Sequence, residues 1–116
     1  MGKTKYIPFD RILTPGQVAR ITEDSPYLAG IIKSVQIAWP NGCNGLVDVA
    51  AWYGNQDKLV PQQTTTVDFL ALNDITPTYD GINIEKNDGT PVWVEMRNRD
   101  AINPHHIVVV IAIEVN

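Results

Sequence analysis

The stretch WPNGCNGLVDVAAWYG, residues 39–54, decides the fold class. Two Asn-Gly dipeptides bracket Cys43, and Asn-Gly is a strong turn signal because both residue types tolerate positive φ. The residues that follow alternate with a period of two, which places on one face Val47, Val49, Ala51 and Tyr53. The other face then carries Leu46, Asp48, Ala50 and Trp52. The stretch therefore predicts a tight turn that leads into a core β-strand.

Other segments between turn signals show the same period. In GIIKSVQIAW, residues 30–39, alternation predicts a buried face made of Ile31, Lys33, Val35, Ile37 and Trp39. In VWVEMRN, residues 92–98, the inner face is expected to carry Val92, Val94 and Met96, and the outer face Trp93, Glu95 and Arg97. The segment INIEKNDGTPVWVEM, residues 82–96, predicts a hairpin around its Asn-Asp-Gly turn.

The two ends of the chain are also expected to be extended. HIVVVIAIEVN, residues 106–116, is apolar on both faces as far as Glu114, which predicts a central strand covered on both sides, on one of them by a neighbouring subunit. TPGQVARITED, residues 14–24, is predicted as a strand or an extended arm, with a short helix as the alternative. We expect residues 1–29 to form an N-terminal arm, or else an ordinary edge strand of the same subunit, and residues 30–116 to form a β-sandwich. The whole pattern predicts an all-β protein, a jelly-roll-like sandwich of about eight strands.

Composition narrows the range of partners. The chain has 116 residues, a formal net charge of −4 and a pI of about 4.9, so an affinity for nucleic acid is not expected. It has no basic run that would favour an anionic membrane surface. The longest apolar run, IVVVIAI at residues 107–113, is too short to span a bilayer. The start of the chain lacks the apolar stretch of a signal peptide, so we expect a soluble protein made in the cytoplasm.

No residue pattern points to catalysis or to a cofactor. Cys43 is the only cysteine, so an intrachain disulfide is excluded, and a nucleophilic role would need a base beside it. The two histidines, His105 and His106, are adjacent, so on a strand they face opposite ways and rarely share a metal. The segment NDITPTYDG, residues 73–81, lacks the dense ligand repeat of a calcium loop and is predicted as a plain loop. We expect a protein that is not an enzyme.

The aromatic residues suggest contact surfaces. The alternation turns Trp52 and Trp93 away from the core, and exposed tryptophans mark protein contacts more often than plain surface. A sugar-stacking platform formed by Trp52, Trp93 and Tyr79 is the alternative. Together with the apolar residues of the N-terminal arm, the candidate interface residues are Tyr6, Phe9, Ile12, Leu13, Trp52 and Trp93.

Two long stretches resemble small β-sandwich proteins from the virions of tailed viruses. They are GIIKSVQIAWPNGCNGLVDVAAWYGNQDKLVPQ at residues 30–62 and GTPVWVEMRNRDAINPHHIVVVIAIEV at residues 89–115. The shared motifs are turns and strands rather than catalytic residues, and the likeness leaves out the first 29 residues. The resemblance implies a jelly-roll module that decorates a capsid or forms another virion part of a bacterial or archaeal virus.

This resemblance also implies a homotrimer that contacts the major capsid protein or another virion protein. Its location would then be the virion, after synthesis in the host cytoplasm. The sequence-based expectation is thus a non-enzymatic structural virion protein that acts through protein–protein contacts. A carbohydrate-binding β-sandwich module remains the alternative.

Overall fold

The computed structural model describes residues 2–24, 28–55, 57–62 and 68–115, which form nine β-strands and no helix. The strands are β1 (Lys3–Leu13), β2 (Val18–Thr22), β3 (Gly30–Ala38), β4 (Val47–Tyr53), β5 (Asp57–Val60), β6 (Thr78–Tyr79), β7 (Ile84–Lys86), β8 (Val92–Asn98) and β9 (His105–Val115).

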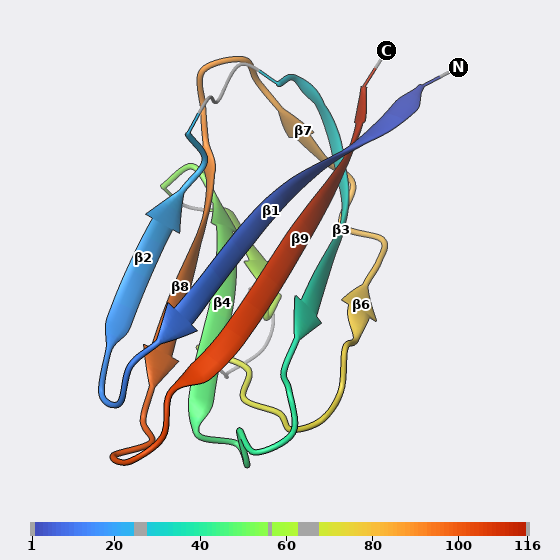
Figure 1. Cartoon of the computed structure of the whole chain (residues 1–116). Coiled ribbons are helices and arrows are strands. Elements are labelled where there is room, and N and C mark those ends of the chain that lie inside the picture. Colours follow the sequence, from blue (N-terminus) through green and yellow to red (C-terminus); the bar gives the residue numbers. More distant parts are fainter. Residues whose placement is uncertain (1, 25–27, 56, 63–67, 116) are drawn as a thin grey trace.

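The strands pair in a nested order that defines a jelly roll. β1 pairs with β9, β2 with β8, β3 with β6 and β7, and β4 with β5, and every pair is antiparallel. Successive pairs alternate between two sheets, which we call sheet A (β1-β9-β3-β6, with β7 also on β3) and sheet B (β2-β8-β4-β5) (Figure 1). This order is that of two interlocked Greek keys, so the predicted all-β jelly roll is confirmed.

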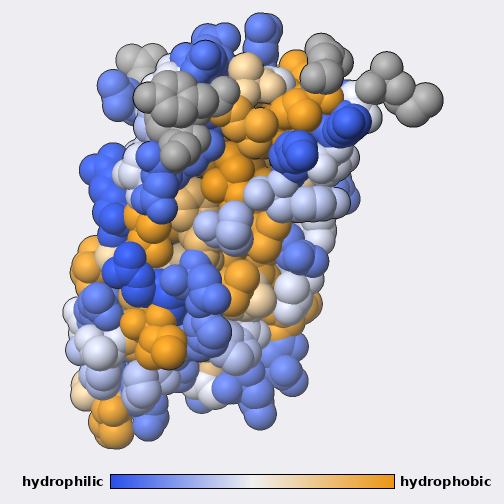
Figure 2. Space-filling model, turned by 45° about the horizontal axis from the view of Figure 1, so that its top comes forward, coloured by the Kyte–Doolittle hydropathy of each residue, from blue (hydrophilic) through white to orange (hydrophobic). Residues whose placement is uncertain are grey.

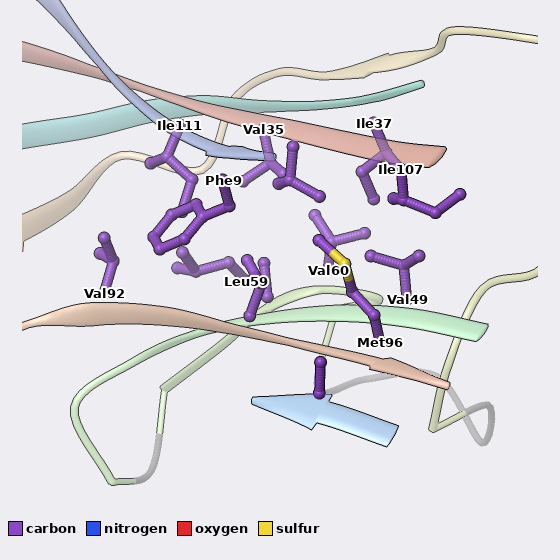
Figure 3. Packing of buried hydrophobic residues seen from close by; sticks show 14 of the residues in the cluster. Phe9, Val35, Ile37, Val49, Leu59, Val60, Val92, Met96, Ile107 and Ile111 are labelled. Carbon is purple, nitrogen blue, oxygen red and sulfur yellow. The ribbon is translucent and has the colours of Figure 1, made fainter. Parts of the chain in front are cut away.

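The core fills the layer between the two sheets. The predicted inner faces of β4 and β8 are confirmed, because Val47, Val49, Val92 and Val94 have no exposed surface. Side chains of sheet A meet them from the opposite side (Figure 3). The residues from sheet A include Phe9, Val35, Ile37, Ile107 and Ile111.

Strand β3 departs from the predicted alternation at its first half. Val35 and Ile37 are buried as expected, but Ile32 is buried while Ile31 and Lys33 are only half-buried. The pairing of β3 with β9 shifts register between Ile32 and Ser34. A β-bulge of this kind inserts one residue and reverses the facing of every side chain beyond it. The strand was therefore predicted correctly, but its buried face was wrong over residues 31–33.

The predicted hairpin at residues 82–96 is wrong, although its turn is present. Thr90 N donates to Asn87 O at 3.4 Å, and Gly89 has φ 92°, as a tight turn requires. The two flanking strands belong to different sheets, however, since β7 pairs with β3 and β8 pairs with β2 and β4. The segment is a connection across the sandwich rather than a hairpin.

The described part of the first 29 residues, residues 2–24 and 28–29, contributes one strand to each sheet. Residues 18–22 form β2, so the predicted strand in residues 14–24 is confirmed and the short helix is not found. β1 pairs with β9 along its whole length, from Lys3 with Val115 to Leu13 with His105. In this structure residues 3–13 are therefore an edge strand of their own subunit, which was the alternative to a free arm.

Strand β9 lies between β1 and β3, in the central position predicted for it. Its inner row, Ile107, Val109, Ile111 and Ile113, is fully buried. Its outer row contains Val108 and Val110, which are half-buried and have no second layer over them within the described part of the chain. The subunit that was expected to cover this second face remains a prediction.

Candidate interaction surfaces

Four side chains, one from each strand of sheet B, form a row on its outer face. They are Arg20, Trp93, Trp52 and Lys58, in the order of the strands. The two indole rings are stacked, with centroids 5.3 Å apart and planes within 2°. The Arg20 guanidinium lies 3.7 Å from the Trp93 centroid, and Lys58 Nζ lies 5.6 Å from the Trp52 centroid. The two tryptophans that were predicted to face outward thus stack on each other, with a cation beside each of them. We call this row of four residues the ladder.

The ladder argues against a sugar platform made of these tryptophans. A sugar ring stacks on an open aromatic face. In the strand order of sheet B, Arg20 and Trp52 contact Trp93 from the strands on either side of it, and Trp93 and Lys58 lie on either side of Trp52 in the same way. Tyr79 lies in sheet A, where it pairs with Val35 and packs against the core, and burial raises the pKa of its phenol. The three aromatic residues do not converge on one site.

A second charged cluster on sheet B was not predicted from the sequence. Asp48 is buried, and its carboxylate lies 3.0 Å from Arg97 Nη2 and 2.8 Å from Arg99 Nε. The Arg97 guanidinium also stacks on Phe69, 3.8 Å from the ring centroid. Alternation placed Asp48 and Arg97 on outer faces, but only the pairing of β4 with β8 brings them opposite each other. The cluster neutralises a buried carboxylate with two cations.

The four candidate interface residues of β1 divide between the core and the surface. Tyr6 is 65% exposed and Ile12 is 62% exposed, so both are available to a partner. Phe9 is 3% exposed and Leu13 is fully buried, and both belong to the core of their own subunit. Neither of these two side chains can contact a partner in the folded chain, because β1 turns them inward against sheet B.

The outer face of sheet A is hollowed by two adjacent grooves. One has a volume of about 500 Å³ and is lined by Tyr6, Gln36, Thr78 and Val110, among others. The next, of about 450 Å³, lies at Val108 and is also lined by His106 and Ile75. Figure 2 shows hydrophobic side chains in a band down the middle of the visible face, with hydrophilic ones on both sides. This combination of apolar centre and polar rim is typical of a contact surface.

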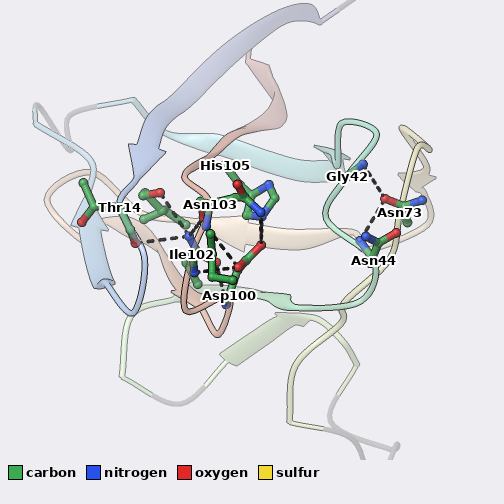
Figure 4. A network of polar contacts seen from close by, with 10 residues as sticks. Thr14, Gly42, Asn44, Asn73, Asp100, Ile102, Asn103 and His105 are labelled. Atoms are coloured by element: carbon green, nitrogen blue, oxygen red, sulfur yellow. Dashed lines mark hydrogen bonds and ion pairs between the residues drawn. The ribbon is translucent and has the colours of Figure 1, made fainter.

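Cys43 lies in the predicted turn and is fully buried. Asn73 Oδ1 accepts hydrogen bonds from Gly42 N at 3.0 Å and from Asn44 N at 2.9 Å, which holds the turn in place (Figure 4). Burial raises the pKa of the Cys43 thiol, and the charge of nearby Asp100 raises it further. A buried, protonated thiol is a poor nucleophile, so the turn has a structural role.

The predicted loop at residues 73–81 supports this turn and the edge of sheet A. Besides Asn73, it contains Ile75, which bridges to Trp39, and β6, which pairs with β3. In the described residues, no three side chains that commonly ligate metals come together.

The two histidines face opposite ways, as adjacent strand residues should. His105 is buried, and its Nε2 lies 2.9 Å from Asp100 Oδ2 (Figure 4). Asp100 also accepts hydrogen bonds from Ile102 N at 2.9 Å and from Asn103 N at 3.1 Å. These backbone donors, with His105, hold the pKa of the Asp100 carboxyl well below its ordinary value.

His106 lies on the outer face of sheet A, where it is paired with Asp10 at an exposed position. The opposite facing of the two adjacent histidines was predicted from the sequence. The partners of each could not be predicted, since Asp10 is far away in the chain and meets His106 only through the pairing of β1 with β9.

Asn98 organises the same end of the molecule and was also missed. Its side chain is buried between the β1–β2 turn and the loop after β8. Nδ2 donates to the carbonyl oxygens of Leu13 and Thr14, both at 3.2 Å, and of Asn103 at 3.1 Å. Oδ1 accepts from Asp100 N at 3.0 Å. One amide thus ties two loops together, and nothing in the local sequence marks it.

No helix in the described part of the chain is long and apolar enough to cross a membrane. Comparison with family models and with curated proteins gives no match. Among solved structures, the chain is similar to one described as "Bacillus endospore appendages form a novel family of disulfide-linked pili", with a TM-score of 0.50 and 14% sequence identity. The similarity covers 99% of this chain and 89% of the other. At this level of identity the likeness concerns the fold, and the chain shares a β-sandwich architecture with that appendage protein.

Proposed function

We propose that this protein is a non-enzymatic structural subunit that acts through protein–protein contacts within a larger homo-oligomeric assembly. The observation that carries the proposal is the outer face of sheet A. There, exposed Tyr6 and half-buried Val110 line one groove, and half-buried Val108 lines the other. Exposed Ile12 lies on the same face, and no layer of the described chain covers it. An apolar surface of this kind on a small protein marks a site that another molecule covers.

The fold neighbour supports the same class of function. Its description is of endospore appendages that form disulfide-linked pili. The single cysteine of the present chain is fully buried, so it cannot reach a thiol of another copy. We therefore propose that copies of this chain associate through non-covalent contacts alone.

The particle that we favour is a virion, on the strength of the resemblance to small β-sandwich proteins of tailed viruses. In that setting the protein would decorate or stabilise a capsid as a homotrimer, with the major capsid protein or another virion protein as partner. Its location would be the virion, after synthesis in the host cytoplasm. A filament is the competing form of assembly.

The test is a measurement of mass and of particle binding on the purified protein. Size exclusion with light scattering at tens of micromolar should give a multiple of 12.9 kDa, and a trimer predicts three times that mass. Co-sedimentation with capsids of a candidate virus should deplete the protein from the supernatant, and filaments seen by negative-stain electron microscopy would favour the pilus-like form instead. A monomer that neither binds capsids nor forms filaments would refute the structural proposal.

A further inference from the structure

One row of side chains crosses four strands of sheet A at its centre. Pro8 pairs with Val110, Val110 pairs with Gln36, and Gln36 pairs with Thr78. Val110 is half-buried and the other three are exposed, so the row lies on the outer face. Gln36 Nε2 donates to Thr78 Oγ1 at 3.3 Å, which keeps the polar half of the row in contact. We call this line of four residues the central row.

We propose that a second copy of the chain packs face to face on sheet A, with its strands antiparallel to the first and with a two-fold axis along the central row. The inference rests on the self-association proposed above and names the surface that mediates it. Across that axis, Val110 meets Val110 of the second copy, and Ala112, two residues along β9, meets Val108.

The size of the face suits such a contact. β1 and β9 have 11 residues each. β3 has nine residues, β7 three and β6 two. At about 3.3 Å per residue and about 4.8 Å between strands, these five strands present a face of roughly 570 Å² before side-chain relief is counted. Stable interfaces bury about 800 Å² on each partner. The whole face is therefore needed, and one apolar strand alone would be too little.

The charges on the face select the direction of the axis. Two sheets that face each other can be related by an axis along the strands or across them. An axis along the strands that runs over the central strand β9 places Glu114 against Glu114 of the second copy, and the two carboxylates repel. An axis across the strands exchanges positions on either side of Val110, so that Glu114, four residues after it, meets His106, four residues before it. His106 Nε2 is paired with Asp10 of its own chain, so the imidazole attracts the Glu114 carboxylate of the second copy when the ring is protonated.

A second pair of charges agrees with the same axis. Lys33 precedes Gln36 by three residues, and Trp39 follows it by three. Trp39 bridges to Ile75, so exposed Asp74 lies at the level that Lys33 of the second copy would reach. Lys33 Nζ donates to Asn83 Oδ1 at 2.8 Å, so this side chain already extends toward the edge of sheet A that carries β6 and β7. The antiparallel arrangement therefore brings two Lys33–Asp74 pairs together in each dimer, one on each side of the axis.

Tyr6 and Asp10 add a third complementary pair. They lie two residues before and two residues after Pro8 on β1, so the axis brings each opposite the other. The phenol of Tyr6 is exposed and can donate a hydrogen bond to the Asp10 carboxylate of the second copy. A two-fold contact gives a dimer by itself, and it joins two trimers into a hexamer if a trimer forms through another surface.

The experiment uses charge reversal with a mixing step. Lys33→Glu and Asp74→Lys should each weaken self-association by about tenfold or more in Kd, measured by analytical ultracentrifugation, since each replaces two attractions by two repulsions. An equimolar mixture of the two variants should recover near wild-type association. In the mixed dimer, the carboxylate introduced at position 33 of one copy faces the ammonium introduced at position 74 of the other, and the unchanged Lys33 and Asp74 face each other.

Two further variants complete the design. Lys5→Glu is the matched control, because it makes the same charge change as Lys33→Glu on the opposite side of β1, and it should leave the Kd unchanged. Val110→Asp, at the centre of the contact, should abolish the two-fold association.

The outcomes separate this inference from the function that it rests on. If the wild type is oligomeric and neither Val110→Asp nor the charge reversals change its mass, another surface is used and the inference is overturned while the structural function stands. If the single variants weaken association but their mixture does not restore it, the antiparallel two-fold axis is wrong. A wild type that stays monomeric at tens of micromolar overturns both. Thermal melts of each variant show whether a loss of association comes from unfolding.

Discussion

The amide of Asn98 tests what holds together the end of the sandwich where the β1–β2 turn meets the loop after β8. It is 2% exposed and contacts three carbonyl oxygens and one backbone N–H. Asn98→Ala removes all four contacts. The amide has only two N–H groups for the three carbonyls, so the loss amounts to about three full hydrogen bonds. At a net value of about 1 kcal/mol each, we expect a loss of about 3 kcal/mol in the free energy of unfolding.

Asn98→Asp is the sharper variant because it keeps the shape of the side chain. The carboxylate cannot donate, and it places a negative charge against three buried carbonyl oxygens, so at pH 7 we expect a larger loss than for Asn98→Ala. Burial and the carbonyls favour the protonated form, which restores one donor, so the pKa of the new carboxyl is raised on folding. The excess loss should be absent below the ordinary pKa of an aspartate, about 3.9, and should grow as pH rises through the folded-state pKa.

The assay is urea unfolding followed by tryptophan fluorescence at pH 7 and at about pH 4.5. Asn55→Ala, at an exposed turn residue, is the control and should change the unfolding free energy by less than about 0.5 kcal/mol. The reasoning fails if Asn98→Ala loses less than about 1 kcal/mol. It also fails if the gap between the two Asn98 variants is the same at both pH values.

Three further predictions concern buried polar groups. Lys86 Nζ lies 3.2 Å from Glu23 Oε1, both side chains are almost fully buried, and Lys86 also donates to a backbone carbonyl oxygen at 2.8 Å. Glu23→Gln should therefore lose about 3 kcal/mol, and the double variant Glu23→Gln with Lys86→Met should lose less than the sum of the single variants in a double-mutant cycle of urea unfolding. The pKa of Asp100 is lower in the folded than in the unfolded chain, so its ionised carboxylate stabilises the fold at pH values above the unfolded-state pKa. The stability difference between wild type and Asp100→Asn should therefore be constant from pH 7 to about pH 5 and shrink below about pH 4. Thermal melts across this pH range test the prediction, and a difference that grows in acid would contradict it. Cys43 should react with a thiol reagent only at the rate of unfolding, and fast labelling of the native protein would show that the turn is open.

Local signals in the sequence determined the elements and much of the core. The Asn-Gly turns around Cys43 and the alternation of β4 and β8 depend on residues within one turn or one strand, so their outcome could be predicted without knowing the partners. The same holds for the central position of β9, because a strand that is apolar on both faces is rarely an edge strand. The outward direction of Trp52 and Trp93 also followed from the period of two.

Tertiary structure alone decided the register and the partners. The bulge in β3 reverses the facing of Lys33, and it arises from pairing with β9, which lies far along the chain. The hairpin at residues 82–96 failed for the same reason, since a local turn does not reveal that its two strands join different sheets. Phe9 and Leu13 are buried because β1 closes the edge of sheet A beside β9.

The candidate surfaces likewise depend on residues brought together from distant strands. The ladder on sheet B takes one side chain from each of four strands, and the central row of sheet A takes its residues from β1, β9, β3 and β6. Alternation with a period of two shows which face each residue occupies, but it does not show which residue of another strand lies beside it. The cross-strand neighbour of a residue depends on loop lengths, on bulges and on the packing of the whole core, so only the tertiary structure determines it.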